Sequence, residues 1–303
     1  MLLLNLIKRN ILVYIRDRSN IFFSLLSMLI IIGLMVVFLG KMNADGVVNL
    51  LSQFGEERDT VLDRSNAEQL VILWTLAGIV VVNSVTITLA MVGIMVEDEA
   101  QKRLSSFYVS PVNRGIFVMG YIIAAILMGI IMCILTLIIG EAYIVMTGGT
   151  MIAGNEIGKI LIYILLIVFS SASMVFLIAN FVHSQSAFSG LSTIVGTLVG
   201  FLSAIYLPMG MLPSNIQSVL KCFPLLHGCS FMRKALTDGI LGTTFQGVPQ
   251  EAIDSYKEYM GMTISWRDTI IGDNLQMAIL LFSGIIFIGI SAFLQRKRNV
   301  RSK

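Results

Sequence analysis

The residues best suited to contact another protein lie in the charged run EDEAQKRLSSFYVSPVNR, residues 97–114. Three acidic residues open the run and would favour the N-terminal dipole of a helix, and a basic pair follows one turn later. Pro111 would end that helix. We expect a short rigid helix that a soluble partner contacts through ion pairs, and a solvated loop is the alternative. The candidate contact residues are Glu97, Asp98, Glu99, Lys102, Arg103, Ser110, Pro111 and Arg114.

The sequence contains no recognisable catalytic, nucleotide-binding or metal-binding pattern. The two Gly-Lys pairs, at residues 40–41 and 158–159, lack the upstream Gly and the following Ser or Thr of a phosphate-binding GxxxxGK[ST] loop. The two histidines, His183 and His227, have no partner at metal-ligand spacing. We therefore expect a chain that is not an enzyme and binds no cofactor or metal itself. Any ATP and Mg²⁺ on which it depends would be held by another subunit.

The composition predicts an integral membrane protein with an all-α fold. Of 303 residues, 56% are apolar and 13% are charged, and the mean hydropathy is +0.86. Soluble domains carry charge on about a quarter of their residues. About 20 apolar residues cross a bilayer as a helix, because the helix satisfies every backbone N–H and C=O within the segment. The six predicted spans are residues 21–40, 70–96, 116–146, 160–182, 187–207 and 274–294.

The distribution of Lys and Arg predicts that both termini are cytoplasmic. With this orientation, twelve of the 21 Lys and Arg residues fall in the N-terminal segment, the run at residues 97–114 and the C-terminal tail. Positively charged flanks resist translocation, so they mark the inner side. Trp74 and Trp266 then fall at the outer boundary, where indole rings lie among lipid headgroups. The run at residues 97–115 becomes a cytoplasmic loop, and residues 208–272 become an extracellular segment.

The first 18 residues are predicted to form a helix that lies along the inner membrane surface. Apolar residues recur at helical spacing on one face, and polar residues lie opposite. A charged cluster separates this helix from the first span, and an upstream extension of that span is the alternative. The apolar face holds Leu4, Ile7, Ile11 and Ile15, the polar face holds Asn5, Arg9 and Arg16, and the cluster is Arg16, Asp17 and Arg18.

The predicted spans contain few groups that could carry an ion. Glu141 is the one ionisable residue within an apolar span, and it lies close enough to the outer end to extend to the surface. Asn83 and Ser84 are expected to form hydrogen bonds between helices. Gly196 and Gly200 would let a neighbouring helix approach the fifth span closely. Packing within the chain and dimerisation explain that pattern equally well.

The segment at residues 208–272 is too polar and too often interrupted by proline to cross a membrane, yet too apolar for a solvated loop. Residues 225–236 are predicted to form a short amphipathic helix with Arg233 and Lys234 on its wet face. Short helices here would re-enter the bilayer or lie on its outer surface and close an exit. A disulfide between Cys222 and Cys229 stays an open question. The candidate gate residues are Pro208, Pro213, Phe223, Pro224, His227 and Arg233.

The charged run and the outer segment resemble two motifs of the ABC-2 family of bacterial ABC-transporter permeases, which includes drug, antibiotic and polysaccharide exporters. The inner motif of that family typically reads Gly-Thr-Leu-Glu and then Ser-Pro. Residues 102–105 here read Lys-Arg-Leu-Ser, a departure that predicts ATPase contacts different in detail. The matching residues are Lys102, Arg103, Leu104, Ser110, Pro111, Val112 and Arg114, followed by Leu212, Pro213, Phe223, Pro224, Leu225, His227 and Arg233.

The resemblance implies a pair of permease subunits, identical or not, bound to two copies of a separate nucleotide-binding ATPase. The charged run, together with Arg9, Arg16 and Asp17 of the N-terminal helix, would contact the ATPase. Residues 208–233 would form an outer gate, and substrate would pass between the permeases along the second and fifth spans. A pathway with few charges favours hydrophobic or amphipathic cargo such as a drug, antibiotic, peptide or lipid. The expected location is the bacterial cell membrane.

Two other functions are compatible with the sequence. The first is a secondary transporter coupled to an ion gradient, since sodium held by backbone carbonyls would leave no charged residue in the spans. Transport that survives ATP depletion would favour it. The second is a membrane immunity or sensor protein that sequesters a peptide without moving it. Loss of resistance on removal of the partner's ATPase activity would count against that function.

Overall fold

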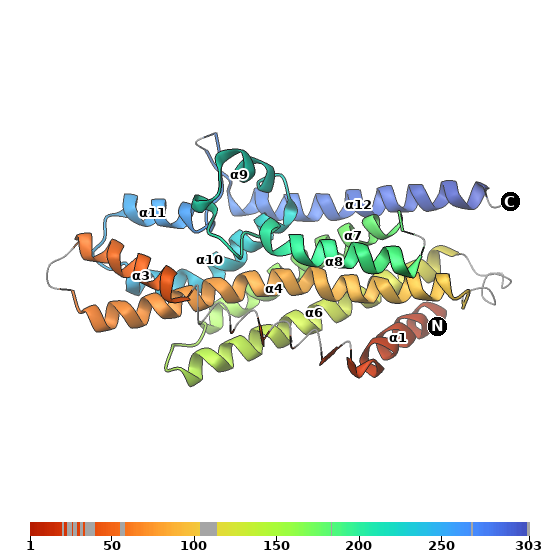
Figure 1. The fold of residues 1–303 in the computed structure, drawn as a ribbon, viewed down its shortest axis with the longest axis horizontal. Coiled ribbons are helices and arrows are strands. Elements are labelled where there is room, and N and C mark those ends of the chain that lie inside the picture. Colours follow the sequence, from red (N-terminus) through yellow and green to blue (C-terminus); the bar gives the residue numbers. More distant parts are fainter. Residues whose placement is uncertain are drawn as a thin grey trace.

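The structure is a computed structural model that describes residues 1–19, 21–22, 26, 29–30, 33, 40–54, 58–103, 114–182, 184–267 and 269–301. Long helices run nearly parallel to one another along the molecule (Figure 1). The elements are α1 (Leu2–Arg16), α3 (Gly40–Leu51), η2 (Ser52–Phe54), α4 (Thr60–Ala100), α6 (Arg114–Met146), α7 (Gly154–Ala179), α8 (Gln185–Leu202), η3 (Met209–Met211), α9 (Ser214–Leu220), α10 (Pro224–Thr244), α11 (Gln250–Tyr259), β1 (Ser265–Trp266), β2 (Thr269–Ile270) and α12 (Asp273–Arg301).

Within the described ranges, five helices are long and apolar enough to cross a membrane. They coincide with the second to sixth predicted spans, which confirms an all-α membrane protein. The first predicted span, residues 21–40, lies mostly outside the described residues. The five helical segments are Thr60–Ala100, Gly115–Met146, Glu156–Ala179, Gln185–Leu202 and Asp273–Leu294.

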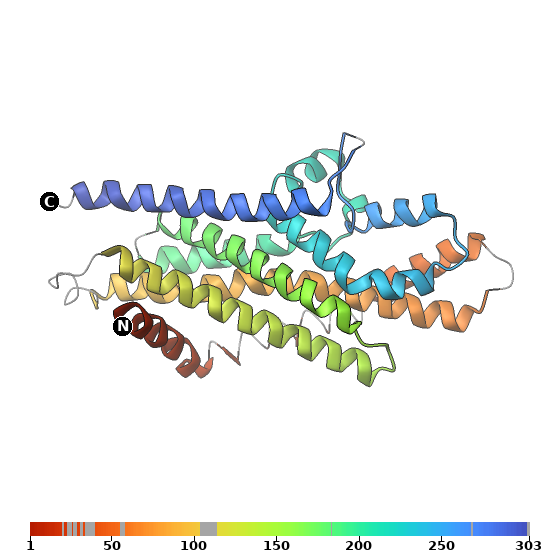
Figure 2. The same ribbon diagram turned by 180° about the vertical axis from the view of Figure 1, so that it is seen from behind.

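The two ends of the chain lie at the same end of the helical bundle, and α3 and α11 lie at the opposite end (Figures 1 and 2). A protein with both termini on one side of the membrane requires this arrangement. The assignment of that side to the cytoplasm stays a prediction from the charge distribution.

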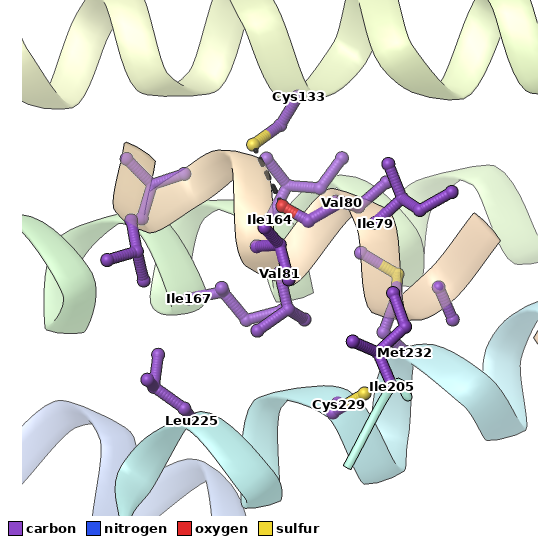
Figure 3. Packing of buried hydrophobic residues seen from close by; sticks show 14 of the residues in the cluster. Ile79, Val80, Val81, Cys133, Ile164, Ile167, Ile205, Leu225, Cys229 and Met232 are labelled. Atoms are coloured by element: carbon purple, nitrogen blue, oxygen red, sulfur yellow. Dashed lines mark hydrogen bonds between the residues drawn. The ribbon is translucent and has the colours of Figure 1, made fainter. Parts of the chain in front are cut away.

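The centre of the bundle is α4, which packs against α6, α7, α8 and α10. It begins well before the predicted span because Asp59 caps its first turn: the Asp59 carboxylate accepts hydrogen bonds from the backbone N–H groups of Val61 at 2.9 Å and Leu62 at 3.2 Å. Figure 3 shows side chains of α4 packed between Cys133 of α6 and Leu225 of α10. The apolar core therefore surrounds one helix on several sides.

Polar side chains join the buried helices, as predicted for this span. Asn83 donates a hydrogen bond to Thr136 of α6 at 2.8 Å, and Ser84 and Ser171 of α7 are hydrogen-bonded at 2.8 Å. Ser170 of α7 and Ser283 of α12 are similarly 3.1 Å apart. In a bilayer such contacts fix the relative rotation of helices, because water does not compete for the hydrogen bonds.

The N-terminal helix α1 packs along α6 and reaches the end of α4. Its buried residues are Ile7, Asn10 and Tyr14. Of the predicted apolar face, Ile7 is buried against the protein while Leu4 and Ile15 are exposed, so only part of this face packs on the protein. Exposed apolar side chains beside a protein-bound face fit a helix held between the bundle and lipid.

The two tryptophans have different environments. Trp74 is buried inside the protein at 1% exposure, so its predicted place among the headgroups is wrong. The reason is that the outer segment folds back over this part of α4, where α10 packs against α4 and α7. Trp266 lies on the β1–β2 hairpin and is 42% exposed.

Candidate functional site

The three acidic residues of the charged run lie at the C-terminal end of α4 and do not begin a new helix. No proline interrupts the long apolar pattern, so α4 continues to Ala100. The predicted stabilisation of Glu97, Asp98 and Glu99 by a helix N-terminus is therefore wrong, because the carboxylates lie at the negative end of the helix dipole. Nearby cations must offset this charge.

Asp98 receives those cations from two directions. Arg9 of α1 forms an ion pair with it: Nη1 is hydrogen-bonded to Oδ2, and Nη2 donates to Oδ1 at 3.0 Å. Arg103, just beyond α4, donates to Oδ1 at 3.3 Å. Tyr121 of α6 donates its hydroxyl to Oδ2 at 2.6 Å, and Arg9 Nη1 lies 3.1 Å from the same hydroxyl. We call these four residues the Asp98 cluster.

The Asp98 cluster binds three helices to a single carboxylate. The Asp98 side chain has 0% exposure, whereas the Arg9 side chain is 38% exposed. A buried carboxylate without partners is strongly destabilising, and here each oxygen accepts more than one hydrogen bond. The hydrogen bond to Asp98 raises the pKa of Arg9 above its ordinary value. The N-terminal helix is thus fixed to the charged end of α4 and to α6.

The predicted ATPase contacts therefore divide into inward-facing and exposed residues. Asp98 presents no surface to a soluble protein in this conformation, and Arg9 is directed at it. Glu99, Lys102 and Arg103 are exposed at the end of α4. Arg16 lies exposed in the last turn of α1, and Asp17 directly follows that helix. Ser110 and Pro111 lie outside the described residues, and Arg114 begins α6.

Sequence reasoning did not single out Tyr121. It lies within an apolar span and carries no motif, so the one available signal was a hydroxyl near the inner end of that span. Only the packing of α6 against α1 and α4 shows that this hydroxyl completes the environment of Asp98.

Three of the predicted gate residues mark the starts of helices in the segment at residues 208–272. Pro213 precedes α9, Phe223 is the N-cap of α10, and Pro224 occupies the first turn of α10. Proline suits a first helical turn because its missing N–H would have no partner there. Pro208 similarly precedes η3. Cys222 and Cys229 are both free, so no disulfide joins this segment.

His227 is buried on α10, and its ring Nε2 lies 2.9 Å from the carbonyl oxygen of Lys221. A carbonyl can only accept, so Nε2 carries the proton in the neutral ring. The other ring nitrogen, Nδ1, is buried without a hydrogen-bond partner in the described structure. Burial lowers the pKa of His227, and the hydrogen bond to Lys221 opposes that shift. His183, the other histidine, lies outside the described residues.

Arg233 is fully buried on α10, so its predicted position on a wet face is wrong. The helix is longer than expected and packs against α4, α7 and α12, which leaves little of its surface wet. Lys234, the next residue, forms an ion pair with Asp273 at the start of α12.

The predicted glycine contact on α8 is not made within the described part of this chain. Gly196 has open space where a side chain would stand, and Gly200 contacts the ring of Tyr206 from the loop that follows. Glu141 accepts a hydrogen bond from the backbone N–H of Ile152 at 3.1 Å, which fixes the loop after α6. The described residues contain no cluster of potential metal ligands.

Comparison with protein families supplies the decisive observation. The family model described as ABC-2 type transporter matches residues 1–237, which include the charged run and the first part of the segment at residues 208–272. The chain belongs to the ABC-2 type transporter family. This permease is therefore the membrane component of an ABC transporter, a family whose permeases associate with an ABC ATPase subunit. A search of curated proteins gave no match.

The departure from the family's inner motif has a structural consequence in this ABC-2 permease. Lys102, which stands where the family typically has Gly, adopts a left-handed backbone with φ of 54°. The N–H of Lys102 bonds to the carbonyl of Glu99 at 3.1 Å, and that of Arg103 bonds to the carbonyl of Asp98 at 3.0 Å. These two bonds form a Schellman motif, in which glycine is the residue of lowest strain. Lysine preserves the turn at an energetic cost.

Proposed function

We propose that this permease exports a hydrophobic or amphipathic substrate, such as a drug, antibiotic, peptide or lipid, as one of a pair of permease subunits driven by a separate ATPase. The location is the bacterial cell membrane, with both termini in the cytoplasm. The ATPase holds ATP and Mg²⁺, and the permease contributes no catalytic residue. The Asp98 cluster is the observation that carries this proposal.

The cluster supports mechanical coupling because it binds α1, α4 and α6 at one point. An ATPase that contacts α1 or the run at residues 97–114 would move all three helices together. Glu99, Lys102, Arg103 and Arg16 are exposed and form the contact surface. Asp98 and Arg9 act behind that surface, by keeping α1 in register with the ends of α4 and α6.

The exposed face of α8 supports pairing with a second permease. Ser189 and Thr193 donate their hydroxyls to backbone carbonyls four residues earlier, at 3.0 and 3.1 Å, and Thr197 does the same. The polar atoms of this face are thus satisfied within the helix, and Gly196 leaves open space beside them. A compact face of this kind favours close approach of another helix. We assign it to the other permease and to the substrate pathway between the two.

Reconstitution tests the function. The permease is placed in liposomes with and without its ATPase, and efflux of a panel of hydrophobic fluorescent dyes is followed after addition of ATP and Mg²⁺. We expect dye movement only with both proteins and ATP, and none with an ATPase variant that lacks its phosphate-binding lysine. Dye movement by the permease alone, or one driven by an ion gradient without ATP, would refute the proposal and favour a secondary transporter.

A further inference from the structure

Arg233 occupies an unusual position for a cation, because its side chain is completely buried at the outer end of the bundle. It lies on the face of α10 that also carries Ser230 and Thr237, at helical spacing. Ser230 donates its hydroxyl to the carbonyl of Met262 at 2.6 Å. This face of α10 therefore holds the chain that follows α11.

The guanidinium of Arg233 donates hydrogen bonds to two chain segments that are far apart in sequence. Nη2 donates to the carbonyl oxygen of Ala204 at 2.7 Å and approaches that of Ser203 at 3.5 Å. Nη1 donates to the carbonyl oxygen of Met260 at 3.2 Å. The first two carbonyls belong to the end of α8, and the third belongs to the end of α11. One planar side chain thus bridges both ends.

Trp74 of α4 covers the guanidinium. The central carbon of Arg233 lies 4.0 Å from the centroid of the Trp74 ring, and the indole N–H donates to the same Met260 carbonyl at 2.8 Å. Cation–π contact of this kind is stronger when water is excluded. The indole holds both the guanidinium and the turn in place.

The described residues provide Arg233 with no carboxylate partner, and its Nε atom has no hydrogen-bond partner among them. Burial accordingly lowers the pKa of Arg233. An apolar side chain would fill this space without the cost of burying a charge. What an apolar side chain would not provide is a pair of donors for the carbonyls of Ser203 and Ala204, which directly follow the last turn of α8.

Both turns that Arg233 bridges contain a residue with a left-handed backbone. Ala204 adopts φ of 49° where α8 ends, and Gly261 adopts φ of 66° after α11. A Cβ atom on Gly261 would lie 3.0 Å from Arg233 Nη1. The turn after α11 therefore requires glycine both for its left-handed backbone and for the close approach of the guanidinium.

We propose that Arg233 is a positioning residue that fixes the outer end of α8 to the turn after α11, so that α8 and the outer segment move as one unit. If the permease transports as proposed above, this unit carries motion of α8 to the outer gate. Ser230 joins α10 to the same turn but does not reach α8. Its removal therefore distinguishes the attachment of the turn to α10 from the attachment of the turn to α8.

The test measures the distance between α8 and α11 in the purified full-length permease in lipid nanodiscs, by electron spin resonance. Spin labels replace Thr197 and Ser255, both exposed, in a Cys222→Ser background, because Cys222 is exposed while Cys133 and Cys229 are buried. Labelled protein is diluted with unlabelled protein so that distances between copies do not contribute. Thermal midpoints are recorded for every variant.

The wild-type background should give one narrow distance. Arg233→Met should lose it and give a broad distribution, and Arg233→Lys should also broaden it, since an ammonium is too compact to reach both chain ends. Ser230→Ala and Lys234→Met, which do not touch α8, should retain the narrow distance. If Arg233→Met does not fold, Arg233→Lys and Trp74→Phe test the same proposal. Both should broaden the distance distribution, because Trp74→Phe removes the indole N–H that holds the Met260 carbonyl.

A purely structural role for Arg233 would lower the thermal midpoint while the folded protein kept its narrow distance, and that result would overturn the proposal. The measurement needs neither the ATPase nor a substrate. Its failure would leave the proposed transport function untouched, and failure of the dye experiment would leave this distance result untouched.

Discussion

Arg9 and Asp98 are 89 residues apart in sequence, yet the guanidinium of one pairs through both of its terminal nitrogens with the carboxylate of the other. Planar two-point pairing of this kind is a property of Arg that Lys does not share. The pair attaches the N-terminal helix to the charged end of α4. Any soluble partner that moves α1 therefore also displaces the central helix of the bundle.

Removing the Asp98 carboxylate should destabilise the permease. Asp98→Ala leaves the Tyr121 hydroxyl without its acceptor and Arg9 without its counter-ion, and should cost about 2–3 kcal/mol, because breaking one side of a buried ion pair leaves the other side uncompensated. Arg9→Ala leaves the buried Asp98 carboxylate with Arg103 as its remaining cation. If Arg103 compensates that charge, Arg9→Ala should cost less than Asp98→Asn or Asp98→Ala. Thermal unfolding in detergent measures these differences.

The matched control for this cluster is Arg16→Ala, which removes an exposed arginine from the same helix. It should leave the thermal midpoint unchanged. The double variant Arg9→Ala, Asp98→Ala should be less destabilised than the sum of the single variants, because the two groups lose one shared interaction. Strict additivity would show that the ion pair contributes nothing to stability.

Lys102→Gly should stabilise the permease. Its left-handed φ of 54° is free of steric cost for glycine alone, so relief of that strain should contribute about 1 kcal/mol despite the greater unfolded-state entropy of glycine. Lys102→Ala removes the same charge without relieving the backbone and should give no gain. Gln101→Gly, at φ of −83°, should be neutral or destabilising. Equal stability of the Gly and Ala variants at residue 102 would contradict this account.

Stability should depend on pH through His227. The pKa of this buried ring is lower in the folded protein than its ordinary value of about 6.5, so the folded state resists protonation. The contribution of the neutral ring is fully present above about pH 6.5 and is lost as the pH falls through the folded-state pKa. Thermal midpoints measured from neutral to mildly acidic pH should therefore decrease.

His227→Gln should flatten that pH dependence, because the glutamine amide can donate to the Lys221 carbonyl without titrating. The comparison is made in a His183→Gln background, which removes the other histidine of the chain. An unchanged pH slope after the loss of both histidines would assign the dependence to another group.

Two glycines should respond oppositely to alanine. A Cβ on Gly78 would lie 2.7 Å from the Ile205 side chain, so Gly78→Ala should cost about 1–3 kcal/mol through overpacking. Gly196 has open space, and Gly196→Ala should be neutral or stabilising, as expected for a helix position with room for a methyl group. Circular dichroism melts measure both. A large loss at Gly196 in the isolated chain would place a contact there that the structure lacks.

The same open position tests the pairing of permeases. Gly196→Leu should leave the melting of the separated permease unchanged but reduce the fraction recovered as a pair in crosslinking of membranes, since the bulky side chain blocks close helix approach. Gly239→Leu, at an exposed position with open space outside α8, serves as the size-matched control. Unchanged crosslinking in Gly196→Leu would remove α8 from the interface.

The amino-acid sequence alone determined the class of this protein, its membrane spans and its family. The class and the spans follow from local composition, because long apolar helices satisfy their own backbone, and the family follows from the resemblance of contiguous motifs such as the charged run with Ser-Pro. The start of α10 near Pro224 and the charged end of α1 likewise followed from proline and charge. The first span at residues 21–40 and the Ser110-Pro111 step lie beyond the described structure and stay predictions.

Tertiary structure decided which charged residues are buried. Helical periodicity placed Arg233 on a wet face, and the order of charges placed Asp98 at the start of a helix, because such patterns report one segment and not what packs against it. Burial of Arg233 depends on the carbonyls at the ends of α8 and α11, and burial of Asp98 depends on Arg9 and Tyr121. These partners come from segments distant in the chain. Only the folded packing brings them within hydrogen-bonding distance, and that distance determines whether a buried charge is stable.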